Sequence, residues 1–139
     1  MSDEMNDWNT KIMAEFRANG GKVAEFGNGP LLILHSTGRK SGQERFSPLM
    51  YQDLGGGSYA IFASKAGAPD NPDWYHNVLA DPSVTAELGT HDAAFTAREA
   101  VGEERDRIWE RQKTEWPQFA GYEEATTRTI PVIVLDPAS

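Results

Sequence analysis

Six short strand-like segments, separated by turn residues, most constrain the fold of this chain. Residues 30–37 are apolar and lie between two glycines, so they predict a strand buried on both faces. Further strands are expected at residues 44–52, 58–64, 83–89, 93–100 and 130–135. The segments do not alternate regularly with helices, as the strands of a parallel sheet do. The pattern therefore predicts a small antiparallel β-barrel with attached helices, in the mainly β, α+β class.

Helical patterns flank these strands. Residues 3–19 carry apolar side chains at helical spacing, and Gly20-Gly21 ends the pattern, so they predict an amphipathic helix. A second helix is expected with Asn71 as its N-cap and Pro72 at its first position, ending near residues 81–82. A third is expected at 103–114. We expect one domain over residues 1–139, with the helix of residues 1–20 able to move against the barrel.

Composition excludes several kinds of chemistry. The 139 residues include no cysteine, so disulfides, thiolate zinc sites and thiol nucleophiles are ruled out. The three histidines, His35, His76 and His91, show no metal-ligand spacing, so no metal is expected. No secretory signal and no run of roughly 20 apolar residues is present, which favours a cytoplasmic protein. Peripheral membrane docking of the first helix stays an alternative, against which its acidic start argues.

Positive charge is concentrated in one part of an acidic chain. The formal net charge is -8; residues 1–34 hold three basic and five acidic groups, and residues 66–139 hold six and fourteen. Residues 35–65 hold four basic and two acidic groups, so they are the net positive part. No nucleic-acid partner is expected, because duplex binding requires a broad basic face. The local excess predicts a small anionic ligand.

The loop TGRKSG at residues 37–42 is the first candidate site. Its glycines let the backbone turn toward a ligand, and Arg39 and Lys40 can hold a phosphate or carboxylate. Ser41 adds a hydroxyl. The alternative is a hairpin loop with solvated cations, since exposed charges are ordinary on protein surfaces.

Two aromatic clusters are further candidates. In residues 63–77, Trp74 and Asn77 lie one helical turn apart, where a planar ring could stack and an anion could bind, or where Trp74 is simply core. In residues 115–122, Trp116, Phe119 and Tyr122 recur every three residues, which predicts one helical face. That face is either core or a mobile lid over a pocket.

Five motifs occur in order between about residues 31 and 137: TGRKSGQ at 37–43, PL at 48–49, ASKAG at 63–67, NPDWYHN at 71–77 and RTIPV at 128–132. Together they resemble the deazaflavin-dependent nitroreductase family, the coenzyme F420-dependent quinone reductases of actinobacteria. The resemblance implies a split β-barrel of the flavin-reductase or pyridoxamine-phosphate-oxidase-like type. It also implies an oxidoreductase that transfers a hydride from reduced coenzyme F420, whose phosphodiester and oligoglutamate tail need cations.

The resemblance also implies roles for individual residues. The first candidate for hydrogen-bond donation to the acceptor is Ser64, and the proton is expected from solvent, Ser64 or Tyr122. The cofactor-binding set it implies is Arg39, Lys40, Ser41, Pro48, Met50, Phe62, Ala63, Ser64, Lys65, Trp74, Tyr75 and Asn77. The substrate-pocket set it implies is Trp116, Phe119 and Tyr122.

The acceptor expected from the resemblance is a hydrophobic small molecule. A quinone or an activated C=C bond, as in unsaturated lactones and coumarins, is favoured over nitro compounds, because tyrosines of the family's nitroreductase are replaced here by Trp116 and Phe119. The alternatives are a non-catalytic F420-binding module and a split barrel that uses FMN or haem. A monomer is favoured over a homodimer.

Overall fold

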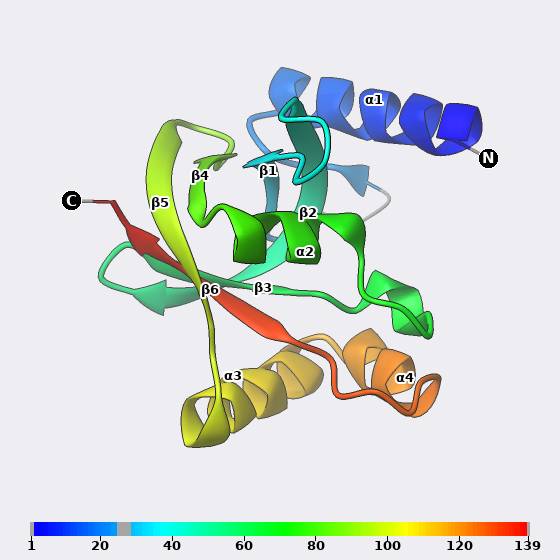
Figure 1. Ribbon diagram of the computed structural model, residues 1–139, viewed down its shortest axis with the longest axis vertical. Coiled ribbons are helices and arrows are strands. Elements are labelled where there is room, and N and C mark those ends of the chain that lie inside the picture. Colours follow the sequence, from blue (N-terminus) through cyan, green and yellow to red (C-terminus); the bar gives the residue numbers. More distant parts are fainter. Residues whose placement is uncertain (1, 25–28, 139) are drawn as a thin grey trace.

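The barrel predicted from the sequence is present and closed. The computed structural model describes residues 2–24 and 29–138, and six antiparallel strands in this part form one barrel in the order β1-β2-β3-β6-β5-β4 (Figure 1). Their bounds are β1 Leu31–Thr37, β2 Glu44–Gly55, β3 Ser58–Phe62, β4 Ser83–Glu87, β5 Asp92–Glu99 and β6 Val132–Pro137. Because the first strand pairs with both β2 and β4, the sheet closes without a free edge there.

Strand β1 shows why the apolar runs are continuous. Leu32 and Leu34 belong to a cluster drawn from five strands, which fills the barrel. Leu31 and Ile33 point the other way, into a second cluster that includes helix side chains. All four are at most 2% exposed. Fully burying each such side chain stabilises the fold by roughly 1.5–3 kcal/mol, so both faces of this strand hold the molecule together.

Helices cover the barrel from several sides. Their bounds are α1 Ser2–Ala18, α2 Asp73–Ala80, α3 Gly102–Glu115 and α4 Gln118–Glu124, with a short 3₁₀ helix, η2, at Lys65–Gly67. In Figure 1, α1 lies at the top, α3 and α4 at the bottom, and α2 crosses in front of the strands. Ile12 and Phe16 of α1 and Trp109 of α3 pack into the outer cluster, whereas Trp74 and Val78 of α2 pack into the barrel interior. None of the helices in the described part is long and apolar enough to cross a membrane.

Several expected boundaries are corrected. Strand β2 continues to Gly55 rather than ending at residue 52, because a bulge between Asp53 and Gly55 carries it into the turn. The Asp53 carboxylate accepts the Gly55 N–H at 2.8 Å. Strand β3 ends at Phe62, and β6 runs over Val132–Pro137, two residues later than expected.

Two helix predictions were wrong in detail. Asn71 does not cap α2; the helix begins at Asp73 after Pro72, because the Asn71 side chain accepts a hydrogen bond from Arg128 instead. The aromatic segment is not one helical face either. Trp116 ends α3, Pro117 breaks the chain direction, and Phe119 lies on the separate helix α4.

Candidate functional site

A groove of about 610 Å³ opens beside the loop between β1 and β2. Three parts of the chain line it: α1, the β1–β2 loop with the start of β2, and the first turns of α2. Its charged lining comprises the cations of Arg39, Lys40 and Arg45 and the carboxylates of Glu44 and Asp73. Cations therefore outnumber carboxylates in the lining. Four of the predicted cofactor ligands meet here, and they are Arg39, Lys40, Ser41 and Asn77.

Asn77 fixes the position of Arg39. Its Oδ1 accepts the Arg39 main-chain N–H at 3.1 Å and the Arg39 Nη1 at 2.9 Å. Asn77 is only 4% exposed. Arg39 Nη1 also donates to the Asp73 carbonyl at 3.4 Å, while its Nη2 lies 3.7 Å from the Asp73 carboxylate. The guanidinium is therefore held against α2 before any ligand arrives, which reduces the entropy lost on binding.

The loop itself is a tight turn. The Gly38 N–H donates to the Gln43 carbonyl, and the Gly42 N–H donates to the Gly38 carbonyl, both at 2.8 Å. Gly42 has φ +71, a conformation that L side chains rarely adopt. A Cβ on Gly38 would lie 2.7 Å from Ser41 Oγ. These glycines thus allow the close turn that presents the cations, as the sequence predicted.

Lys40 and Ser41 differ in how many partners their side chains have within the protein. Ser41 Oγ accepts the Gln43 N–H at 3.2 Å and Arg45 Nη2 at 3.4 Å, so the hydroxyl keeps its own proton for a ligand. Lys40 is exposed and, within residues 2–24 and 29–138, has no carboxylate partner. A tightly positioned guanidinium beside an uncommitted ammonium is a donor set suited to phosphate and carboxylate groups.

The segment after β3 carries the predicted donors Ser64 and Lys65. Ser64 is 9% exposed, and its hydroxyl has no hydrogen-bond partner in the described part of the chain. Lys65 is exposed and has φ +47, the left-handed region that is strained for a lysine. Neither residue lines the cationic groove.

Arg128 is the residue that sequence reasoning missed. It lies before β6, and its guanidinium donates to the carbonyls of Ala63, Ser64 and Ala68 and to Asn71 Oδ1. The RTIPV motif contained it, but no role was assigned. The available signal was an arginine that lies directly before an apolar strand.

Most of the residues predicted to lie along the deazaflavin ring are packed inside the protein. Met50 and Phe62 belong to the outer core cluster, and Ala63 and Trp74 to the barrel interior. Trp74 is 6% exposed, in agreement with the alternative that it is core. Pro48 is half-buried on β2, opposite Ile33.

Tyr75 points to the sheet. Its hydroxyl donates to Glu99 on β5 at 2.8 Å. Burial, and then this bond to Glu99, raises the pKa of Tyr75 to about 12. The phenol is therefore committed to a carboxylate rather than aimed into the groove.

The aromatic segment divides between core and surface. Phe119 is 4% exposed, with its ring 5.5 Å from Phe62 and 6.1 Å from Trp109, so it belongs to the core. Tyr122 is half-buried and packs edge-on against Phe119 at 5.1 Å. Trp116 is also half-buried. Of the predicted substrate-pocket residues, Trp116 and Tyr122 are the two with substantial accessible surface.

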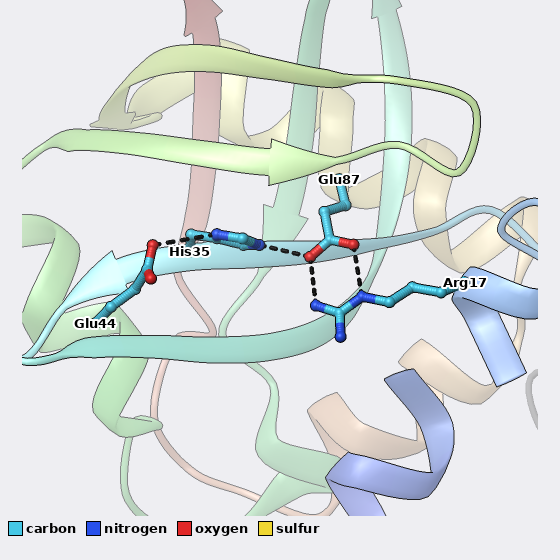
Figure 2. Close-up of polar contacts among 4 residues, drawn as sticks. All are labelled: Arg17, His35, Glu44 and Glu87. Atoms are coloured by element: carbon cyan, nitrogen blue, oxygen red, sulfur yellow. Dashed lines mark hydrogen bonds and ion pairs between the residues drawn. The ribbon is translucent and has the colours of Figure 1, made fainter. Parts of the chain in front are cut away.

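A polar network ties α1 to the barrel (Figure 2). Arg17 donates to both carboxylate oxygens of Glu87, from Nε at 2.9 Å and from Nη2 at 2.7 Å. His35 joins Glu87 at 2.6 Å through Nε2 and Glu44 at 3.2 Å through Nδ1. The bond from Arg17, followed in smaller measure by that from His35, lowers the pKa of Glu87 below its usual value.

This network reaches the groove through Glu44 and through helix α1. Glu44 lines the groove directly, and α1, which carries Arg17, contributes Asn9, Thr10 and Met13 to the lining. The Arg17–Glu87 pair therefore holds one wall of the groove.

No group of three or more residues that could hold a metal ion occurs in the described part of the chain.

The architecture and the groove define the class of protein. A closed antiparallel barrel flanked by helices, with a groove beside its first helix, is a split β-barrel. The fold is shared with distant proteins such as the haem storage protein HutZ from Vibrio cholerae, at 14% identity and a TM-score of 0.61, covering 91% of this chain and 88% of that one. This distant likeness concerns the fold alone.

The chain belongs to the F420H(2)-dependent quinone reductase family, whose model matches residues 8–137. It is 35% identical over 127 residues to the F420H(2)-dependent quinone reductase Rv1261c of Mycobacterium tuberculosis, covering 88% of this chain and 85% of that protein. It is also 41% identical to a solved F420-H2-dependent reductase, FDR-A, with a TM-score of 0.70 over 77% of this chain and 94% of that one.

A further solved relative is described as a domain-swapped dimer; it is 36% identical, with a TM-score of 0.72 over 94% of this chain and 98% of that one. Family membership confirms the predicted oxidoreductase class and identifies reduced coenzyme F420 as the cofactor.

Proposed function

We propose that the cationic groove binds the phosphodiester and the first tail carboxylates of coenzyme F420. The observation that carries the proposal is the pairing of a guanidinium fixed by Asn77 with the uncommitted ammonium of Lys40. Arg39 provides a two-pronged hydrogen-bonding surface for a phosphate, and Lys40 supplies mobile charge. Ser41 adds a hydroxyl donor. The loop thus acts as the anchor for the anionic half of the coenzyme.

The reducing end of the coenzyme would then lie toward Ser64, Lys65 and Tyr122. When bound, reduced F420 supplies a hydride to the acceptor. The Ser64 hydroxyl, which has no partner among the described residues, is free to donate to an acceptor oxygen as negative charge develops there. Tyr122 is a second proton source, and Lys65 adds positive charge beside the site.

The acceptor that family membership favours is a quinone, which takes up one hydride and one proton to become a hydroquinone. Reduction of an activated C=C bond in an unsaturated lactone or coumarin uses the same hydride and proton. Nitro compounds are proposed as poor substrates, because Trp116 and Phe119 lack the phenol protons that tyrosines would offer. Phe119 is moreover buried in the core.

A homodimer is proposed as the assembly, on the precedent of the domain-swapped relative. Light scattering coupled to gel filtration measures it directly. Docking of α1 on a membrane stays an alternative, against which its acidic start argues.

The experiment that tests the function is binding of oxidised coenzyme F420, followed by its fluorescence at two salt concentrations. We expect Arg39→Ala and Lys40→Ala to weaken binding and to reduce its salt dependence, because each removes one cation. Lys22→Ala is the matched control, since it removes an exposed lysine outside the groove lining. Equal binding by all four proteins would contradict the anchor.

Turnover separates the enzyme from the alternative of a non-catalytic binding module. Purified protein with reduced coenzyme F420 and a benzoquinone should regenerate the oxidised deazaflavin absorbance. Tight coenzyme binding without turnover of any quinone or lactone would instead favour the binding module.

A further inference from the structure

In the part of the chain that the structure describes, the Arg128 guanidinium forms all of its hydrogen bonds with one segment, residues 63–71. Its Nη1 donates to the Ala63 carbonyl at 3.1 Å and to Asn71 Oδ1 at 2.6 Å. Its Nη2 donates to the Ser64 carbonyl at 3.0 Å, and its Nε to the Ala68 carbonyl at 3.0 Å. Every nitrogen of the guanidinium is thus engaged with residues 63–71. Arginine carries five N–H donors in one plane, so its side chain can bind several backbone carbonyls of a turn at the same time.

These bonds have no charge partner. Among the described residues, Arg128 forms no ion pair with a carboxylate, so its positive charge is shared with neutral oxygens only. Arg17 and Arg98, by contrast, both pair with carboxylates. An unneutralised guanidinium at the carbonyl of Ser64 also adds positive potential to the segment that carries Lys65.

The backbone that Arg128 holds is strained. Lys65 adopts φ +47, which a non-glycine residue keeps only where its surroundings over-determine it. Arg128 fixes the chain immediately before Lys65, at Ser64, and again after it, at Ala68. Gly67 lets the segment pack directly against the end of α4, because a Cβ at this position would lie only 2.7 Å from the Cβ of Ala125. The segment is therefore clamped from two sides.

We propose that Arg128 is a positioning residue for Ser64. It holds the Ser64 carbonyl and its neighbours so that the free hydroxyl stays aimed at the acceptor during hydride transfer. This inference rests on the proposed function, in which Ser64 donates to the acceptor. It predicts that Arg128 affects the reaction only through residues 63–71, and that it contributes little to anchoring the coenzyme tail in the groove.

The test compares Arg128→Gln with Arg111→Gln, a control that removes an exposed arginine on α3. In the free protein, amide hydrogen exchange should become faster in residues 63–71 for Arg128→Gln and stay unchanged there for the control. The dissociation constant of F420 should change by less than about threefold. In contrast, kcat should fall by on the order of 10²-fold, the loss expected when a group at the reaction site is misplaced by about 1 Å.

A double-mutant cycle shows whether the effect passes through Ser64. In the Ser64→Ala background, Arg128→Gln should lower kcat by less than about threefold further. A full additional loss in that background would overturn the proposal, as would wild-type kcat or unchanged exchange in the single variant.

Two milder variants keep the test decisive if Arg128→Gln does not fold. Asn71→Ala removes one acceptor, while Arg128→Lys keeps the charge and loses the fork; both should show the same pattern in smaller measure. Failure of the wild-type protein to bind coenzyme F420 would overturn the proposed function itself. Normal wild-type binding and turnover with unaffected Arg128 variants would overturn the positioning role alone.

Discussion

Asn77 Oδ1 accepts two hydrogen bonds from Arg39, one from the main-chain N–H at 3.1 Å and one from Nη1 at 2.9 Å. One buried amide thus sets both the loop backbone and its guanidinium. Asn77→Ala should weaken coenzyme F420 binding about tenfold, the ratio that corresponds to a hydrogen bond to a charged group. Fluorescence titration of the coenzyme measures this change.

Asn77→Asp provides the matched comparison. A carboxylate keeps both acceptor positions and pairs more strongly with Arg39, so the fold should be at least as stable as with alanine. It also neutralises the cation, so affinity should still fall. Unaltered affinity in both variants would show that Arg39 does not bind the coenzyme.

The Arg17–Glu87 pair predicts a measurable coupling between α1 and the barrel. In a double-mutant cycle with Arg17→Ala and Glu87→Gln, we expect a coupling energy of about 1 kcal/mol, since the pair is bidentate but Arg17 is half exposed. Urea unfolding measures it. Additive effects of the two substitutions would mean that the pair contributes nothing to stability.

The same pair gives a pH dependence in acid. The pKa of Glu87 is lower in the folded protein than its ordinary value of 4.5, so its stabilising contribution is complete above pH 4.5. That contribution is lost as pH falls through the lower folded value. The free energy of unfolding should therefore decline more steeply below pH 4.5 in the wild type than in Glu87→Gln.

Local patterns made most of the barrel predictable. The run around Leu32 and Leu34 identified a strand buried on both faces, because alternation and burial depend on neighbours one and two residues away. The groove loop was predictable for a similar reason, since its glycines and cations lie within a few residues of one another. Family resemblance then supplied the ligand that such a loop suits.

Contacts between distant residues were not predictable. Arg17 and Glu87 are 70 residues apart, and Asn71 and Arg128 are 57 apart, so no local pattern marks either pair. Asn71 illustrates the consequence: its sequence position suits a helix cap, but a tertiary bond of 2.6 Å outcompetes that local role. Phe119 shows the same limit, because a proline ended the helical face that its spacing predicted.

Tyr75 predicts an alkaline effect on stability. Its pKa is raised from 10.0 to about 12 by burial and by Glu99, so the unfolded chain loses this proton first. The stabilisation is present below pH 10 and is lost as pH rises through about 12. Between these values, the free energy of unfolding should fall more steeply in the wild type than in Tyr75→Phe. Parallel slopes in the two proteins would contradict the shift.

Substitution of Gly67 should cause the largest loss of stability, because both the backbone conformation and the lack of space for a side chain require glycine at this position. Its φ is +82, and a Cβ would lie 2.7 Å from Ala125 Cβ and 2.9 Å from the Tyr122 carbonyl. Gly56 is the matched control: its φ is +65 and no atom lies within 4 Å of a Cβ placed there. Gly56→Ala should cost about 1–2 kcal/mol from the backbone conformation alone.

Gly67→Ala should lose a further 1–3 kcal/mol or so, because α4 must move to accommodate the methyl group. Chemical denaturation of the two variants measures the difference. Since Tyr122 moves with α4, Gly67→Ala should also reduce quinone turnover at temperatures where the protein remains folded, whereas Gly56→Ala should not. Equal stability of the two variants would show that η2 and α4 are not in the close contact seen here.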